Sequence, residues 1–205
     1  MYLYPIWIRI WHLINAILVI ILIITGISIH FAGDSQTFFL MNPDKAVRWH
    51  NFAAVLLIIG YIGFVAGNIL SENGKYYKLE KRDFWKGVVL QLRYYSYGMF
   101  KGEKNPFTVT FDRKFNPLQK LSYVLVMYVS LPILIITGIG LLLPDETLDK
   151  LYKVKRSGLS DLLHITMGFL ISIFLLIHIY TCTLGSKASS LFRGIITGYR
   201  DSGDD

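Results

Sequence analysis

Four of the five histidines lie inside long apolar stretches, where an ionisable side chain is expensive. His12, His50, His164 and His178 are each flanked by aliphatic and aromatic residues. An imidazole in hydrocarbon costs a few kcal/mol unless a hydrogen bond or a ligand satisfies it. A single histidine of this kind is explained equally well by a hydrogen bond between helices. Four of them favour metal ligation.

The spacing of these histidines predicts two pairs. His164 and His178 are 14 residues apart, which on an α-helix returns to within about 40° of the same face and separates them by about 21 Å. If the apolar stretches cross a membrane in alternating directions, His12 lies level with His178 and His50 lies level with His164. The sequence therefore predicts one pair near each membrane surface.

Two imidazoles that face each other in an apolar bundle are typical of bis-histidine haem ligation. The chain has one cysteine, Cys182, and no C-x-x-C-H motif, so any haem must be held by coordination alone. Within the predicted stretches the histidines are accompanied by one carboxylate, Asp161, and one thiol, Cys182, whereas zinc or non-haem iron would need ligands clustered at one depth. The pattern predicts two b haems.

His30 is the alternative ligand for the outer pair. It follows His12 by 18 residues, which places it on the same face about 27 Å away, near the outer surface. We favour His50 because it lies deeper, while His30 is followed by a loop with the polar residues Asp34, Ser35 and Gln36. Gly26 and Gly168 lie near the predicted outer haem, where a missing Cβ permits the close approach of a ring; packing between helices explains them equally well.

The elements that must position these histidines are four apolar segments. The chain of 205 residues is 53% hydrophobic and 17% charged, too apolar for a soluble domain of this size. A bilayer core about 30 Å thick needs roughly 20 apolar helical residues. We therefore expect an all-α, integral membrane four-helix bundle that is a single domain over residues 1–205 and binds two stacked haems. The predicted spans are residues 8–30, 46–70, 119–143 and 160–183, with a loop over residues 71–118.

The basic residues predict the orientation. Fifteen Lys and Arg residues fall on the side of the termini and the 71–118 loop, including its junction with the third span, and six fall on the other side. By the positive-inside rule, both termini and this loop are cytoplasmic, in a multi-pass protein of the inner membrane. The net charge of +7 is then a topology signal, and no nucleic-acid partner is expected. The first apolar run lacks a small-residue cleavage site and is expected to remain as a helix.

Two local patterns concern the loops. Asn42-Pro43-Asp44 supplies an N-cap, a proline and an early acid, so the second helix is expected to begin before Lys45. Residues 83–100 mix apolar and aromatic side chains with Lys86 and Arg93. This segment is either an amphipathic helix at the membrane interface or an irregular loop packed on the bundle.

A series of short motifs resembles the membrane cytochrome b subunits of respiratory oxidoreductases. They are Trp11-His12 in the first span, His50 in the second, FNPLQK (Phe115 to Lys120) opening the third, Thr137-Gly138 within it, and His164 with His178 in the fourth. The resemblance covers nearly the whole chain. The chain resembles the bacterial cytochrome b561-like group. This group includes the gamma subunit of formate dehydrogenase-N and the cytochrome b subunits of hydrogenase and thiosulfate reductase.

The resemblance implies the same ligand pairs, His12 with His178 for the inner haem and His50 with His164 for the outer. It also implies a quinone site beside the inner haem, near the N-x-x-Q motif of Asn116 and Gln119. A quinone, membrane lipid and an extracytoplasmic iron–sulfur or multihaem redox subunit would then be the partners. The implied function is electron transfer across the membrane, by a subunit rather than a complete enzyme.

Two other functions stay open at the level of sequence. One is a stand-alone transmembrane quinol-dependent reductase of the b561 type. The other is a haem-free structural anchor or transporter subunit. Assembly as a homo-oligomer within a larger complex is a further open alternative.

Overall fold

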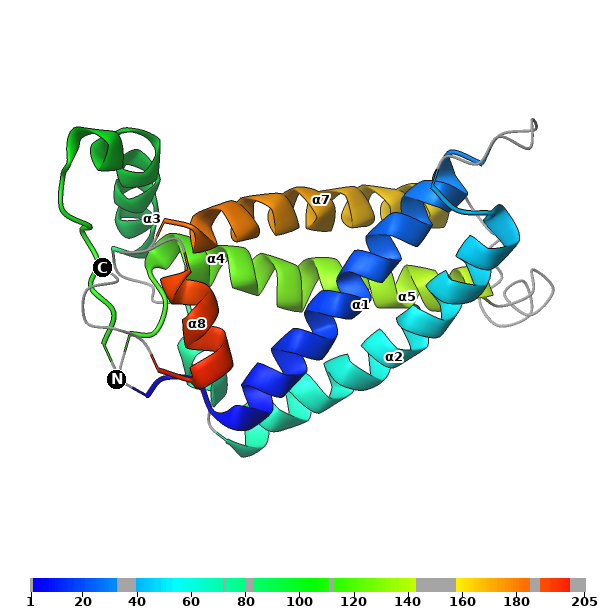
Figure 1. Ribbon diagram of the computed structural model, residues 1–205, viewed down its shortest axis with the longest axis horizontal. Helices are drawn as coiled ribbons and strands as arrows, with labels where there is room; N and C mark the ends of the chain where they lie inside the picture. Colours follow the sequence, from blue (N-terminus) through cyan, green and yellow to red (C-terminus); the bar gives the residue numbers. More distant parts are fainter. Residues whose placement is uncertain are drawn as a thin grey trace. The chain divides into compact units, whose positions relative to one another are not determined.

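The computed structural model describes residues 2–32, 40–71, 73–79, 83–110, 113–142, 158–184 and 189–199. Within these ranges, four helical segments are long and apolar enough to cross a bilayer, with a mean hydropathy of 2.2–2.5. They are α1 (Ile6–His30), α2 (Pro43–Leu70), the segment from Pro117 to Leu142, and α7 (Gly158–Cys182) (Figure 1). The prediction of an all-α membrane protein with four spans is confirmed.

The observed helices begin a few residues before the predicted spans. Asn42 Oδ1 accepts hydrogen bonds from the backbone N–H groups of Asp44 and Lys45, at 3.1 and 3.4 Å, so α2 begins at Pro43, as the capping pattern predicts. Residue 143, the predicted end of the third span, lies outside the described residues. So do several of the basic residues used to predict the orientation: Lys81, Arg82, Lys150, Lys153, Lys155, Arg156, Lys187 and Arg200.

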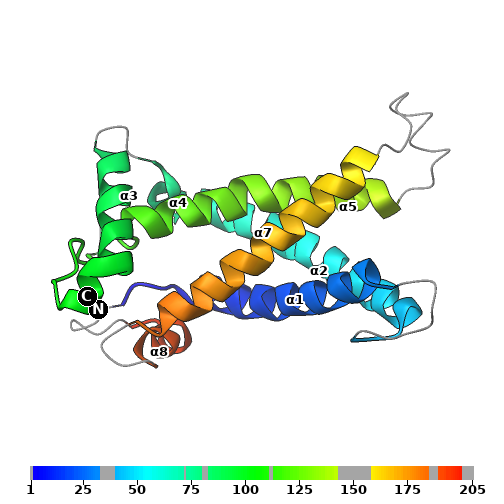
Figure 2. The same ribbon diagram turned by 90° about the horizontal axis from the view of Figure 1, so that it is seen from above.

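The third span is not a uniform α-helix. It consists of α4 (Pro117–Leu125), a π-helical turn (Val126–Ser130) and α5 (Leu131–Leu142); α4 and α5 are labelled in Figures 1 and 2. Pro132 lies at the start of α5 and has no backbone N–H to continue the α-helical ladder. A π turn directly before a proline absorbs this interruption within the helix.

The described helices belong to two compact units. One unit comprises Met1–Arg9, Ala66–Val129 and Phe174–Asp205, and the other comprises Ile10–Val65 and Ser130–Ile173. The second unit therefore contains most of α1, α2 and α7, together with α5. The expectation of a single domain over residues 1–205 stays a prediction.

The first unit contains α3 (Phe84–Arg93), which lies in the predicted amphipathic segment. Its buried residues recur every three or four positions, at Phe84, Gly87, Val88 and Gln91, and α3 packs against α4. The segment is thus helical rather than irregular, and continues through a π turn (Tyr94–Gly98) and a 3₁₀ turn (Met99–Lys101). Its location at a membrane interface stays a prediction.

A short C-terminal helix, α8 (Ser190–Thr197), anchors the N-terminal segment in the same unit. No pattern in the sequence predicted this helix. The backbone N–H groups of Leu3 and Tyr4 donate to the Gly198 carbonyl at 2.9 and 3.3 Å, and Arg9 Nε donates to the Ile195 carbonyl at 3.1 Å. Gly198 has a φ of 85°, which favours glycine at this helix end.

Candidate functional site

His50 is held by the first span. Within the second unit, α1 and α2 run antiparallel, because Trp11 Nε1 donates to the Gly60 carbonyl at 2.8 Å and Thr25 pairs with His50 further along. Thr25 Oγ1 lies 2.9 Å from His50 Nδ1. The adjacent Gly26 lies against the same ring, since a Cβ built there would be 3.5 Å from His50 Cε1.

His164 is held in the same way by the third span. Thr137 Oγ1 on α5 lies 2.9 Å from His164 Nδ1 on α7. A Cβ built on the adjacent Gly138 would lie 3.1 Å from His164 Cε1, tighter than in the first case. Both histidines therefore face a Thr-Gly step on a neighbouring helix.

The two rings come together in the second unit. The ring centroids of His50 and His164 are 6.3 Å apart, with an angle of 64° between the ring planes. A metal held in line between two imidazoles, with bonds of about 2 Å on each side, would set the ring centres roughly 6 Å apart. With each Nδ1 engaged by a threonine, each Nε2 is the nitrogen left for a metal.

The donor set of this pair fits a haem better than a bare metal ion. Within the described part of the chain, no group of three or more His, Cys, Asp or Glu residues could hold a metal. A protein site with only two imidazoles is typical of bis-histidine haem ligation, in which the porphyrin supplies the remaining ligands. Gly26 and Gly138 leave the faces next to the two rings uncrowded.

His30 and Gly168 have different surroundings. His30 is exposed, and its ring contacts Phe31 with centroids 4.9 Å apart. A Cβ built on Gly168 would meet no atom of the described residues within 4 Å, so no protein contact there requires glycine. His50, rather than His30, is thus the histidine found opposite His164.

His12 and His178 belong to different units. His12 is partly buried and follows Trp11, whose indole stacks on Phe64 with centroids 4.5 Å apart. The His178 ring stacks on Phe174, with centroids 5.5 Å apart and an angle of 16°. The pairing of His12 with His178 stays a prediction.

Aromatic rings and a thiol surround His178 within its unit. Tyr123 meets the ring edge to face, with centroids 6.2 Å apart. The Sγ atom of Cys182 lies 4.0 Å from His178 Nε2, which is a weak hydrogen-bond contact. These neighbours could not be assigned from the sequence, because ring contacts between helices depend on how the helices pack.

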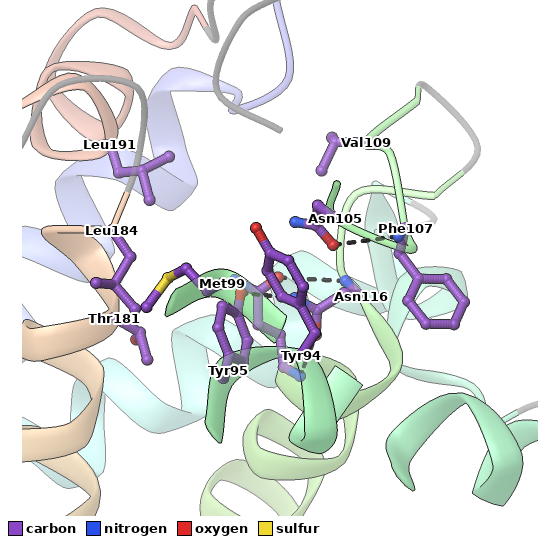
Figure 3. Close-up of a pocket in the computed structure, with 11 residues that line it drawn as sticks. Tyr94, Tyr95, Met99, Asn105, Phe107, Val109, Asn116, Thr181, Leu184 and Leu191 are labelled. Carbon is purple, nitrogen blue, oxygen red and sulfur yellow. Dashed lines mark hydrogen bonds between the residues drawn. The ribbon is translucent and has the colours of Figure 1, made fainter. Parts of the chain in front are cut away.

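Asn116 and Gln119 form a complete capping box at the start of α4. Asn116 Oδ1 accepts from the Gln119 backbone N–H at 2.8 Å, and Gln119 Oε1 accepts from the Asn116 backbone N–H at 3.2 Å. Asn116 Nδ2 also donates to the Tyr95 hydroxyl at 3.2 Å (Figure 3). Both side chains therefore have a structural role.

The same two residues line a cavity in the first unit. Its walls combine polar and apolar side chains: Tyr94, Tyr95, Met99, Asn105, Phe107, Val109, Asn116, Gln119, Thr181, Leu184 and Leu191 (Figure 3). The cavity volume is about 50 Å³, well below the roughly 300 Å³ at which ligand pockets usually begin. A quinone ring could enter only if long side chains such as Met99 and Leu184 moved.

Gln91 is a polar residue of this unit that the sequence analysis missed. It is fully buried on α3, one turn before Tyr94 and Tyr95. Neither Oε1 nor Nε2 of its amide has a hydrogen-bond partner among the described residues. A buried amide without a protein partner calls for a water molecule or a ligand.

A second cavity in the first unit is basic. Its volume is about 270 Å³, and it is lined by Lys75, Tyr76, Lys78, Arg113, Lys114, Phe115 and Lys120. The ammonium groups of Lys114 and Lys75 lie 4.1 and 5.3 Å from the centre of the Tyr76 ring. Partial burial, with the nearby charge of Lys75 as a smaller cause, lowers the pKa of Lys114 below its ordinary value. These cations belong to the side of the chain predicted to be cytoplasmic.

Comparison with known proteins places this chain in a family. The model of the prokaryotic cytochrome b561 family matches residues 3–198. The chain belongs to the prokaryotic cytochrome b561 family. With its four spans, it is therefore a multi-pass membrane b-type cytochrome of electron transfer. The predicted resemblance is confirmed.

Individual relatives of this b561 cytochrome are also named as cytochromes. A protein of Escherichia coli (strain K12) named "Putative cytochrome YdhU" is 34% identical, over 97% of this chain and 74% of the relative. Proteins of Cupriavidus necator and Rhodobacter capsulatus named "Probable Ni/Fe-hydrogenase B-type cytochrome subunit" are 23% and 27% identical, over 97% and 100% of this chain and 86% and 82% of the relatives. No solved structure matches the chain.

Proposed function

We propose that this cytochrome is a single-domain, di-haem subunit that moves electrons across the inner membrane, between the quinone pool and an extracytoplasmic redox subunit. The observation that carries the proposal is the His50–His164 pair, with ring centroids 6.3 Å apart and both Nδ1 atoms engaged. The outer haem would be held by these two residues. The inner haem would be held by His12 and His178.

The chain's own residues would determine where the haem is held in the membrane. Haem b supplies one-electron redox chemistry when bound. His50 and His164 present Nε2 from α2 and α7, while Gly26 and Gly138 leave room beside the rings. Both histidines lie within apolar spans, so the protein sets the depth and the dielectric of the site.

The quinone site is proposed at the cytoplasmic mouth of the third span, beside the inner haem. Support comes from the N-x-x-Q motif of the resemblance and from the cavity that Asn116 and Gln119 line. Gln119 Oε1 is occupied by the capping box, which leaves its Nε2 as the donor for a quinone carbonyl. Asn116 and Tyr95 already pair with each other, so they would have to share that bond with a ligand.

The partner and the orientation are proposed on separate grounds. Two relatives are named as cytochrome subunits of a Ni/Fe-hydrogenase, which supports a catalytic partner with iron–sulfur or multihaem centres at the outer face. The excess of Lys and Arg at the termini and the 71–118 loop supports a cytoplasmic location for both. Subunits that co-purify in mild detergent would identify the partner. Quinol oxidase activity of the chain purified alone would favour the stand-alone reductase.

The test of the proposal is the number and ligation of the haems. Purified protein should contain two low-spin b haems per chain, both extractable by acid acetone because neither is covalently attached. His12→Ala and His178→Ala should each remove one haem or convert it to high spin, and the affected haem should be the same in both variants. A stoichiometry of one haem, or two different haems affected by these variants, would refute the two-site arrangement.

A further inference from the structure

The His50–His164 pair is held by two copies of one local motif. Residues 23–28 read IITGIS and residues 135–140 read IITGIG. In each copy, the threonine hydroxyl lies 2.9 Å from a histidine Nδ1 on the next long helix, α2 in one case and α7 in the other. The sequence repeat thus corresponds to a repeated contact, and both ligands of one proposed haem share it.

Each threonine hydroxyl has one proton, and the backbone determines where it goes. Thr25 Oγ1 lies 2.7 Å from the Ile21 carbonyl oxygen, and Thr137 Oγ1 lies 2.7 Å from the Ile133 carbonyl oxygen. A carbonyl oxygen only accepts, so each hydroxyl donates to the preceding turn. The same Oγ1 can then act only as an acceptor toward the imidazole.

The proton position on each imidazole follows. An Oγ1 that accepts at 2.9 Å requires an N–H at Nδ1. Leu22 and Leu134 lie three residues before the two threonines. The carbonyls of these two residues also lie near the threonine oxygens, at 3.2 and 3.3 Å. In a neutral imidazole with its proton on Nδ1, the lone pair is on Nε2.

Burial makes this arrangement persistent. Thr25 is 1% exposed and Thr137 is 8% exposed, so water does not compete for either hydroxyl. If the contact broke within a membrane span, the threonine hydroxyl and the imidazole N–H would find few other hydrogen-bond partners. Gly26 and Gly138 follow the threonines directly, and their lack of a Cβ allows the rings to approach.

We propose that Thr25 and Thr137 are positioning residues that fix His50 and His164 as Nδ1–H tautomers and so direct both Nε2 atoms to one haem iron. This inference rests on the proposed function. A hydrogen bond from Nδ1–H to the threonine oxygen makes the imidazole a stronger electron-pair donor to its metal. The two threonines therefore stabilise ferric over ferrous iron in the outer haem and lower its reduction potential.

The experiment compares Thr25→Val and Thr137→Val, which keep the side-chain shape, with Thr25→Ser and Thr137→Ser, which keep the hydroxyl. Haem content, the low-spin EPR signal and the potential of each haem are measured in the purified holoprotein. Each valine variant should raise the reduction potential of the outer haem by about 59 mV. At a fixed solution potential, this is about a tenfold higher ratio of reduced to oxidised haem. The serine variants should restore the wild-type potential, and the inner haem should not change.

Ser28→Ala is the matched control. Ser28 lies one turn after Thr25, is buried and donates to the Ile24 carbonyl at 2.8 Å, but no described contact joins it to a histidine. Its loss should leave both potentials unchanged. Valine variants with wild-type potentials and EPR signals would overturn the role of the threonines.

A second measurement uses wild-type protein and does not depend on the folding of any variant. Electron-nuclear double resonance of protein labelled with ¹⁵N-histidine, before and after exchange into D₂O, should show an exchangeable proton on Nδ1 of both outer ligands. A ligand without that proton would overturn the inference. If His50→Ala costs no haem, the ligand assignment itself fails, whereas normal valine variants beside a defective His50→Ala would refute only the threonines.

Discussion

The His50–His164 centre and the cavity at Asn116 use their polar atoms in opposite ways. At the centre, each threonine hydroxyl satisfies one backbone carbonyl and one imidazole nitrogen, which leaves one nitrogen per ring for a ligand. At the cavity, the Asn116 side-chain amide is engaged at both ends, since Oδ1 accepts within the capping box and Nδ2 donates to Tyr95. The first region is therefore preorganised for a ligand, while the second must rearrange to admit one.

The difference predicts that substitutions in the first region act on a bound cofactor. Substitutions in the second region that keep the capping atoms should act on quinone kinetics. The largest expected effect is at the centre. His50→Ala or His164→Ala should remove the same single haem or convert it to high spin, because either change would leave one histidine to hold it. Haem quantification of the purified variants measures the loss of a haem, and absorption spectra measure its spin state.

His30→Ala is the control for that prediction. His30 is exposed and contacts Phe31, so both haems should remain. If His30→Ala cost the outer haem while His50→Ala spared it, the two histidines would have to exchange roles.

The next effect concerns the cavity. Gln119→Glu retains the acceptor of the capping box and places a carboxylate at a helix N-terminus, where it is stabilising, but it removes the Nε2 donor. We expect unchanged haem spectra and thermal stability, with quinol-dependent reduction of the inner haem about tenfold slower, equivalent to one lost hydrogen bond of roughly 1.4 kcal/mol. Asn116→Asp, which also keeps its capping acceptor, should slow reduction as well.

Ser122→Ala provides a matched change on the same helix. Ser122 donates to the Leu118 carbonyl at 2.9 Å and is outside the cavity, so quinone kinetics should not change. If Gln119→Glu and Asn116→Asp both left reduction rates and the affinity of a quinone-analogue inhibitor at wild-type values, the quinone would bind elsewhere.

The smallest effect distinguishes the two halves of the centre. A Cβ at Gly138 would lie 3.1 Å from His164 Cε1, whereas one at Gly26 would lie 3.5 Å from His50 Cε1. The shorter distance requires the ring to shift by a few tenths of an ångström, while the longer one is an ordinary contact. Gly138→Ala should therefore broaden or shift the outer-haem EPR signal more than Gly26→Ala does. Equal effects would show that the two Thr-Gly steps are equivalent.

The capping residues show how far local sequence reaches. Asn42 and Asn116 each precede a proline, and each is observed as the N-cap of the helix that follows. Capping depends on groups within three or four residues, so the pattern alone predicts it. The π turn before Pro132 was not predicted, because a missing N–H can be accommodated by a kink, a break or a bulge.

The four spans and their histidines were determined by the sequence itself, because apolar runs of this length leave the backbone no alternative to helix in a bilayer. The partner of each His Nδ1 was decided only by the tertiary structure. Thr25 and His50 are 25 residues apart, and Thr137 and His164 are 27 apart, so no helical period relates them. The register of one helix against another sets which hydroxyl meets which ring, and that register depends on packing along the whole contact.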